Sequence, residues 1–300
     1  MADAAAGYYI PPPSSGFIAL TSVELVCYVI LLAPALWVTW KHKAAGMTWT
    51  TILISYFGLS YTAELFLLIH RNDPLVPGVL LIVTNAGFIA CLTLAIIGLV
   101  YHANMILPLK PKDHNWPAKI IMAITNLINT AGIALATYGG SPSATTGGLI
   151  NAGFDKAGNW MMLIDLLLVF AWALWSWRHT NNLRDHPNRG PARALLLGAL
   201  VATPFHLVRL AYGTAYAYDQ NPKLDWITGS MAVHVIVQFL MQLGVVVAAL
   251  WAGWRARNVV PNAKLFGNDY NNASPLLSGR EDGPPSKQDS PSRQVELANV

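Results

Sequence analysis

The sequence predicts an all-α fold, a seven-transmembrane helix bundle followed by a disordered C-terminal tail. Of its 300 residues, 54% are hydrophobic and 11% are charged, against about 25% charged residues in soluble domains. The mean hydropathy is +0.41. Seven apolar stretches come close to the length of about 20 residues that crosses a bilayer as a helix. These observations exclude an ordinary soluble globule, and the two cysteines exclude a disulfide scaffold.

The first four predicted spans are 17–40, 47–70, 78–107 and 117–137. The first ends before Lys41 and the second before Arg71, since charges are costly in hydrocarbon. The third ends before Pro108. The fourth is the least apolar, and its polar side chains need partners inside a bundle; they are Thr125, Asn126, Asn129 and Thr130.

The last three predicted spans are 159–177, 192–218 and 229–254. The fifth follows a long loop rich in glycine, serine and threonine, and it ends before Arg178. The sixth begins after Pro191 and the seventh ends before Arg255. These boundaries give three predicted domains: a short extracytoplasmic N-terminus (1–16), the seven-transmembrane domain (17–255) and a disordered cytoplasmic tail (256–300).

The loop charges predict the orientation in the membrane. With seven spans, 15 of the 19 lysines and arginines fall on the side of the C-terminus and three on the other side. Because positive charge accumulates on the cytoplasmic side, we expect an extracytoplasmic N-terminus and a cytoplasmic C-terminus. The sequence leaves open whether the membrane is the plasma membrane or an endomembrane.

Several classes of seven-helix protein are excluded by missing residues. A retinal protein needs a lysine in its last span, and 229–254 contains none. The signature clusters of the main G-protein-coupled receptors are absent from the third and seventh spans. The histidines lack metal-ligand spacing, so we predict no metal, no cofactor and no catalytic residue. The expected partners are the lipid bilayer, a small-molecule or lipid ligand and a cytosolic partner of the tail, but no nucleic acid.

Ionisable residues inside the spans mark the candidate site. Each costs about 2.5 to 3.5 kcal/mol to insert, so such residues indicate function by default. At about 1.5 Å of rise per residue, four of them fall roughly 9 to 11 Å below the outer boundary and Arg209 slightly deeper. The four are Glu24, Glu64, Asp165 and His234. Their common depth predicts an outward-facing polar pocket.

Helical spacing adds two tyrosines to this predicted ligand-binding site. Tyr61 lies three residues before Glu64, and Tyr212 lies three residues after Arg209. We expect Arg209 to bind an anionic ligand group and the two hydroxyls to orient it. The alternative is a structural ion pair between Arg209 and either Glu64 or Asp165. Three carboxylates facing one obligate cation leave at least one acid that must be protonated, paired with a charged histidine or solvated.

The sixth span reads Thr203-Pro204-Phe205-His206-Leu207-Val208-Arg209-Leu210-Ala211-Tyr212. With Asn85-Ala86-Gly87 in the third span and Lys156-Ala157-Gly158 before the fifth, it resembles an uncharacterised fungal family of seven-helix integral membrane proteins, a domain of unknown function. The resemblance covers about 17–255 and implies seven helices, a fungal origin and a variable cytosolic tail. It implies no activity.

The sequence therefore predicts a polytopic integral membrane protein that is receptor-like or binds a small molecule or lipid. A membrane-embedded enzyme of the terpene-cyclase type is one alternative, in which an intramembrane carboxylic acid protonates the substrate. A proton-coupled transporter is the other.

Overall fold

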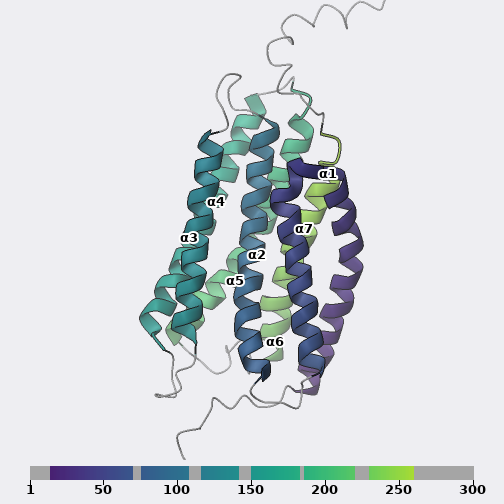
Figure 1. The fold of residues 1–300 in the computed structure, drawn as a ribbon. Helices are drawn as coiled ribbons and strands as arrows, with labels where there is room; N and C mark the ends of the chain where they lie inside the picture. The colour runs from purple at the N-terminus through teal and green to yellow at the C-terminus, as the bar shows by residue number, and fades with distance from the viewer. Residues whose placement is uncertain are drawn as a thin grey trace, which may run out of the picture. The chain divides into compact units, whose positions relative to one another are not determined.

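A computed structural model describes residues 14–69, 76–107, 116–141, 150–182, 186–219 and 230–259, the side chains of 43–45, 76–83 and 116 excepted. The described chain is helical, as predicted. Its elements are α1 (Ser15–Ile69), α2 (Val76–Ile106), α3 (Trp116–Gly140), α4 (Ala152–Asn182), α5 (Arg189–Asp219), α6 (Met231–Val233), the π-helix η2 (His234–Leu240) and α7 (Met241–Arg255) (Figure 1). Most of the predicted N-terminus and nearly all of the predicted tail lie outside the described residues.

Seven membrane spans are confirmed in the described part of the chain. They are Ser15–His42, Gly46–Ile69, Thr84–Ile106, Pro117–Gly140, Ala152–Asn182, Arg189–Asp219 and Met231–Arg255. The shortest has 23 residues, which at about 1.5 Å per residue exceeds a hydrocarbon core of about 30 Å. The fifth span begins at Ala152 instead of the predicted residue 159, because a polar first turn can still be helical when it packs against α3.

The first two spans belong to α1, which folds back on itself. The hydroxyls of Tyr28 and Tyr56 are 2.8 Å apart, although 28 residues of straight helix would separate them by about 42 Å. Figure 1 shows α1 turning at the end of the bundle. Gly46 permits this turn, because a Cβ there would lie 2.4 Å from the Cβ of His42.

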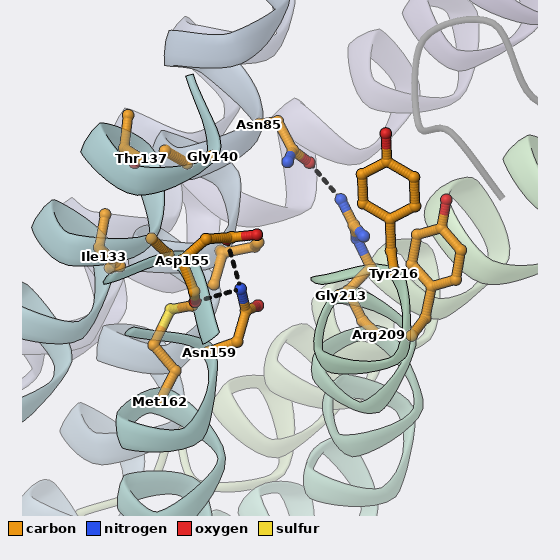
Figure 2. A pocket seen from close by; sticks show the side chains of 14 residues that line it. Asn85, Ile133, Thr137, Gly140, Asp155, Asn159, Met162, Arg209, Gly213 and Tyr216 are labelled. Carbon is orange, nitrogen blue, oxygen red and sulfur yellow. Dashed lines mark hydrogen bonds between the residues drawn. The ribbon is translucent and has the colours of Figure 1, made fainter. Parts of the chain in front are cut away.

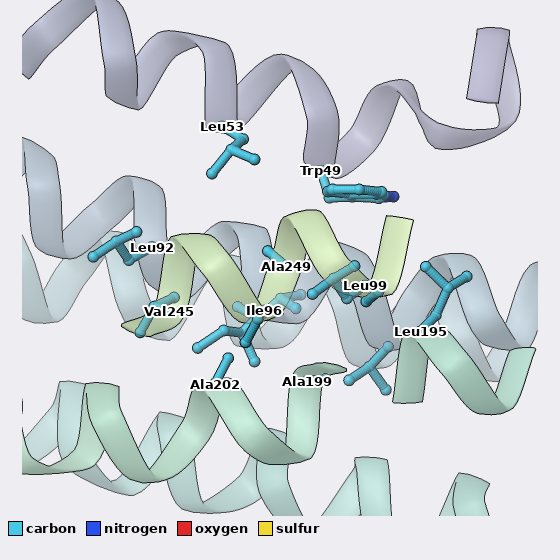
Figure 3. Packing of buried hydrophobic residues seen from close by; sticks show 14 of the residues in the cluster. Trp49, Leu53, Leu92, Ile96, Leu99, Leu195, Ala199, Ala202, Val245 and Ala249 are labelled. Carbon is cyan, nitrogen blue, oxygen red and sulfur yellow. The ribbon is translucent and has the colours of Figure 1, made fainter. Parts of the chain in front are cut away.

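The core forms around α2, which contacts α1, α3, α4, α5 and α7. Figure 3 shows buried side chains of four helices meeting there. They include Trp49 and Leu53 of α1, Leu92, Ile96 and Leu99 of α2, Leu195, Ala199 and Ala202 of α5, and Val245 and Ala249 of α7. Large apolar side chains also cover the outside: Leu127 is 71% exposed and Ile30 is 65% exposed. An apolar exterior of this kind contacts the lipid bilayer.

Side-chain hydrogen bonds connect the helices at the end of the bundle where α1 turns. Trp49 Nε1 donates to His102 Nδ1 at 3.1 Å, which assigns the proton of a neutral His102 to Nε2. His42 Nε2 lies 2.8 Å from the carbonyl oxygen of Gly253. These bonds join α1 to α2 and α7.

Small residues let the helices approach closely. A Cβ on Gly158 of α4 would lie 2.3 Å from the backbone nitrogen of Ala136 and 2.4 Å from the carbonyl oxygen of Gly132, both on α3. Between α5 and α7, a Cβ on Gly198 would lie 2.3 Å from that of Ala252. Close backbone approach through glycine and alanine is typical of helix pairs in membranes, where van der Waals packing drives association.

The α3–α4 contact predicts the effect of one added methyl group. In Gly158→Ala the new Cβ meets backbone atoms, so we expect the free energy of unfolding to fall by about 1–3 kcal/mol. Gly58→Ala is the matched control, because nothing lies within 4 Å of a Cβ at that helical position. The control should be neutral or more stable by about 0.5–1 kcal/mol. Thermal unfolding in nanodiscs, followed by tryptophan fluorescence, measures both variants; equal melting temperatures would contradict the packing described.

Candidate functional site

Two neighbouring polar pockets lie at the end of the bundle where α1 begins. The first is built from α2, α3, α4 and α5, and it includes Gly140 at the end of α3 and Asp155 near the start of α4. The second is built from α1, α2 and the seventh span, and it includes Phe17 near the start of α1. Asn85 of α2 lines both pockets and so connects them.

Arg209 of α5 is the charged centre of the first pocket. Its side chain is 2% exposed, and its terminal nitrogen donates a hydrogen bond to Oδ1 of Asn85 (Figure 2). The guanidinium carbon lies 5.6 Å from the ring centre of Tyr212. Among the described residues its Nε–H has no hydrogen-bond partner. A buried cation therefore faces a neutral amide and keeps donor capacity for a ligand.

The opposite wall of this pocket comes from the first turns of α4. Asn159 Nδ2 donates to the carbonyl oxygen and to Oδ1 of Asp155, each at 2.9 Å, as Figure 2 shows. Gly213 of α5 leaves room for this pair, since a Cβ there would lie 2.9 Å from Asn159 Oδ1. The amide thus holds the Asp155 carboxylate on the α4 side of the pocket.

A pair of carboxyl groups marks the second pocket. Glu24 and Glu64, on the two spans of α1, hydrogen-bond to each other through their side chains. A hydrogen bond between two carboxyl groups needs a proton on one of them. One oxygen of Glu64, Oε2, is buried without a partner in the described part of the chain. The pair therefore holds a proton and retains a free acceptor.

Hydrogen bonds beneath the second pocket tie α1 to α7. The Tyr56 hydroxyl lies 2.8 Å from the Tyr28 hydroxyl and 3.1 Å from Oε1 of Gln242. Since a hydroxyl has a single hydrogen and Oε1 of Gln242 can only accept, Tyr56 donates to Gln242 and accepts from Tyr28, or shares its proton between the two acceptors. Gln242 also lines the second pocket, so this network positions the pocket wall.

The seventh span contains a π-helix, η2, at the second pocket. His234 and Gln238 of η2 line that pocket, and His234 packs edge-on against Phe17 with ring centres 5.3 Å apart. His234 Nδ1 lies 3.3 Å from Gln238 Oε1. Short π-helical segments inside α-helices occur frequently at functional sites.

The structure distributes the seven predicted site residues over several places. Glu24, Glu64 and His234 line the second pocket, and Arg209 and Tyr212 line the first. Tyr61 lines neither of these two pockets; its hydroxyl donates to the carbonyl oxygen of Tyr28 at 2.7 Å. Asp165 is fully buried outside both.

The predicted structural ion pair does not form a hydrogen bond in the described residues. Arg209 bonds Asn85, Glu64 bonds Glu24, and neither carboxylate oxygen of Asp165 has a partner. A search for charged residues does not find Asn85, the amide that connects the pockets, because its side chain is neutral. It does not find Asn159 for the same reason, and Asp155 lies in the first turn of α4, where acidic residues are common.

The protein is a polytopic integral membrane protein, since its seven membrane spans form a bundle that encloses two polar pockets. The profile of DUF7702, a domain of unknown function, matches residues 18–259, and the chain belongs to this family. The resemblance to an uncharacterised family is thereby confirmed, and fungal origin stays a prediction. Comparison with curated proteins and with solved structures finds no match. No group of three or more histidine, cysteine, aspartate or glutamate side chains suited to a metal occurs among the described residues.

The carboxyl pair makes a spectroscopic prediction. Glu64→Gln replaces one carboxyl with an amide that still hydrogen-bonds to Glu24, so the infrared carbonyl band of a protonated carboxylic acid should weaken at neutral pH. Glu24→Gln should weaken the same band. Because both amides keep the hydrogen bond, we expect stability to change by less than about 1 kcal/mol. A band of unchanged intensity in both variants would show that no proton is shared.

Proposed function

We propose that the protein is a receptor-like membrane protein that binds a small molecule or lipid through an anionic group. The observation that supports this most directly is the buried guanidinium of Arg209, which lines a cavity and whose terminal nitrogen donates to the neutral amide of Asn85 within the described part of the chain. An uncompensated charge inside a bundle costs several kcal/mol, about 2.5 to 3.5 on insertion scales. A bound anion would offset that cost.

The lining of the first pocket supports an amphipathic ligand. Ile89, Ile133 and Met162 supply apolar walls, and Tyr212 and Tyr216 supply hydroxyl groups near the arginine. The cavity volume is about 100 Å³, which fits a ligand head group better than a whole lipid. Pockets with apolar walls and a few convergent polar groups are typical of small-molecule sites.

The charge distribution supports an outward orientation for both pockets. They lie at the end where α1 begins, and the loops on that side carry three of the 19 lysines and arginines. By the positive-inside rule we place this end on the extracytoplasmic side and the C-terminus in the cytoplasm. A cytosolic partner of the tail then completes a receptor-like arrangement.

A proton-coupled transporter is the second candidate, because of the carboxyl pair. Glu24 and Glu64 hold a shareable proton in a pocket that adjoins the Arg209 site through Asn85. Proton binding at one pocket and anion binding at the other can then be coupled through one amide. A membrane-embedded enzyme would use the same acids as proton donors, and conversion of a bound compound would distinguish it.

Native mass spectrometry in nanodiscs tests ligand binding. We expect a discrete bound mass on the wild type and its loss from Arg209→Gln, because losing a charge-assisted hydrogen bond of about 1.5–3 kcal/mol weakens binding about tenfold or more. Arg193→Gln is the matched control: Arg193 packs on the Trp177 ring at 4.7 Å and lines neither pocket. The proposal fails if Arg209→Gln keeps the mass or if the wild type carries bulk lipid only.

Proteoliposomes with an internal pH dye test the transporter candidate. Under an imposed membrane potential, a transporter would acidify the vesicle interior, and Glu64→Gln would abolish the acidification by removing the shared proton. Arg193→Gln serves as the control, because Arg193 lines neither pocket. Equal proton entry in wild type and Glu64→Gln would exclude this pair as the proton carrier.

A further inference from the structure

The α3–α4 interface has a regular antiparallel register. Along α3, Gly132, Ala136 and Gly139 are spaced one turn apart, and they meet Met162, Gly158 and Asp155 of α4 in that order. Moving three or four residues toward the C-terminus of α3 corresponds to moving the same number of residues toward the N-terminus of α4. This is expected for antiparallel helices packed side by side (Figure 1). One turn further from the pocket, the same register pairs Asn129 with Asp165.

Both residues of this next pair are completely buried, with 0% of each side chain exposed. In the described part of the chain, neither carboxylate oxygen of Asp165 and neither polar atom of the Asn129 amide has a hydrogen-bond partner. Asn126 lies one turn from Asn129 on α3, and its Oδ1 is also buried without a hydrogen-bond partner in the described residues. A buried polar group without a hydrogen-bond partner is costly, and Asp165, Asn129 and Asn126 each carry at least one, which favours a bound species in this part of the bundle.

The charge of Asp165 limits what that species can be. No lysine or arginine of the described helices hydrogen-bonds to the carboxylate, so its negative charge has no protein counter-ion there. A single buried charge is balanced by one positive charge. The oxygens of one carboxylate and two amides are hard ligands, which suit cations that prefer oxygen over nitrogen or sulfur.

We propose that the α3–α4 interface binds a monovalent cation, Na⁺, between the Asp165 carboxylate and the amide oxygens of Asn129 and Asn126. A divalent ion would leave excess positive charge in the bundle. The site is distinct from the two pockets, because none of its three residues lines either of them. It therefore goes beyond the proposed ligand binding. Met162, which lines the first pocket, lies one turn of α4 before Asp165.

Thermal unfolding of the purified full-length protein in nanodiscs tests the proposal, in NaCl and in choline chloride at equal ionic strength. An ion that binds only the folded state raises its stability, so we expect a saturable rise in Tm of about 2–4 °C in Na⁺ at about ten times the Kd. Asp165→Asn removes the charge and should have the same Tm in both salts. Asp155→Asn, in the first pocket, should keep the Na⁺ effect.

A second measurement separates ion binding from general destabilisation. Equilibrium binding of radioactive ²²Na⁺ should saturate near one ion per chain on the wild type, weaken about tenfold in Asn129→Ala and vanish in Asp165→Asn. If the wild type binds no ²²Na⁺ and melts equally in both salts, Asp165 is protonated or bridged by water and the proposal is overturned. It is also overturned if Asp165→Asn binds Na⁺ as the wild type does.

Discussion

The hydrogen bond between Arg209 and Asn85 is the interaction on which the polar half of the bundle depends. It joins α5 to α2, the helix that touches most of the others, and it fixes the wall between the two pockets. In the hydrocarbon region no water solvates a buried guanidinium. The side chains around Arg209 must therefore accept its hydrogen bonds or balance its charge. A neutral amide orients the arginine without neutralising its charge, and for this reason we propose an anionic ligand.

The rest of the bundle meets the same constraint by different means. At the end where α1 turns, the polar side chains of His42, Trp49 and His102 are paired with each other or with the backbone across three elements. Among the described residues, buried polar atoms without a hydrogen-bond partner occur at both ends of the bundle. They include atoms of Thr48, His102 and His179 at the end where α1 turns, and atoms of Glu64 and Arg209 in the two pockets.

Apolar length was enough to predict seven spans, because the thickness of the bilayer sets the length of a span, and the loop charges agreed with an odd number of spans. For the candidate site, the sequence predicted only the depth of the ionisable residues in the membrane. Counting residues along helices placed Glu24, Glu64, Asp165, Arg209 and His234 at similar levels, yet a level does not say which way a helix faces. The rotation of α4 places Asp165 outside both pockets, and the rotation of α5 directs Arg209 toward α2. These rotations depend on where glycines permit close approach, as at Gly158, which a single sequence does not rank.

The π-helix η2 of the seventh span also sets the rotation between the residues on either side of it. A π-helical turn contains about one residue more than an α-helical turn, in which each residue turns the chain by about 100°. Conversion of η2 to α-helical geometry at unchanged length would therefore rotate everything before it by about that angle relative to α7. His234 would leave the pocket while Gln242 stayed in place. Loss of the π-helical geometry would therefore disturb this pocket more than a conservative exchange of one side chain within η2.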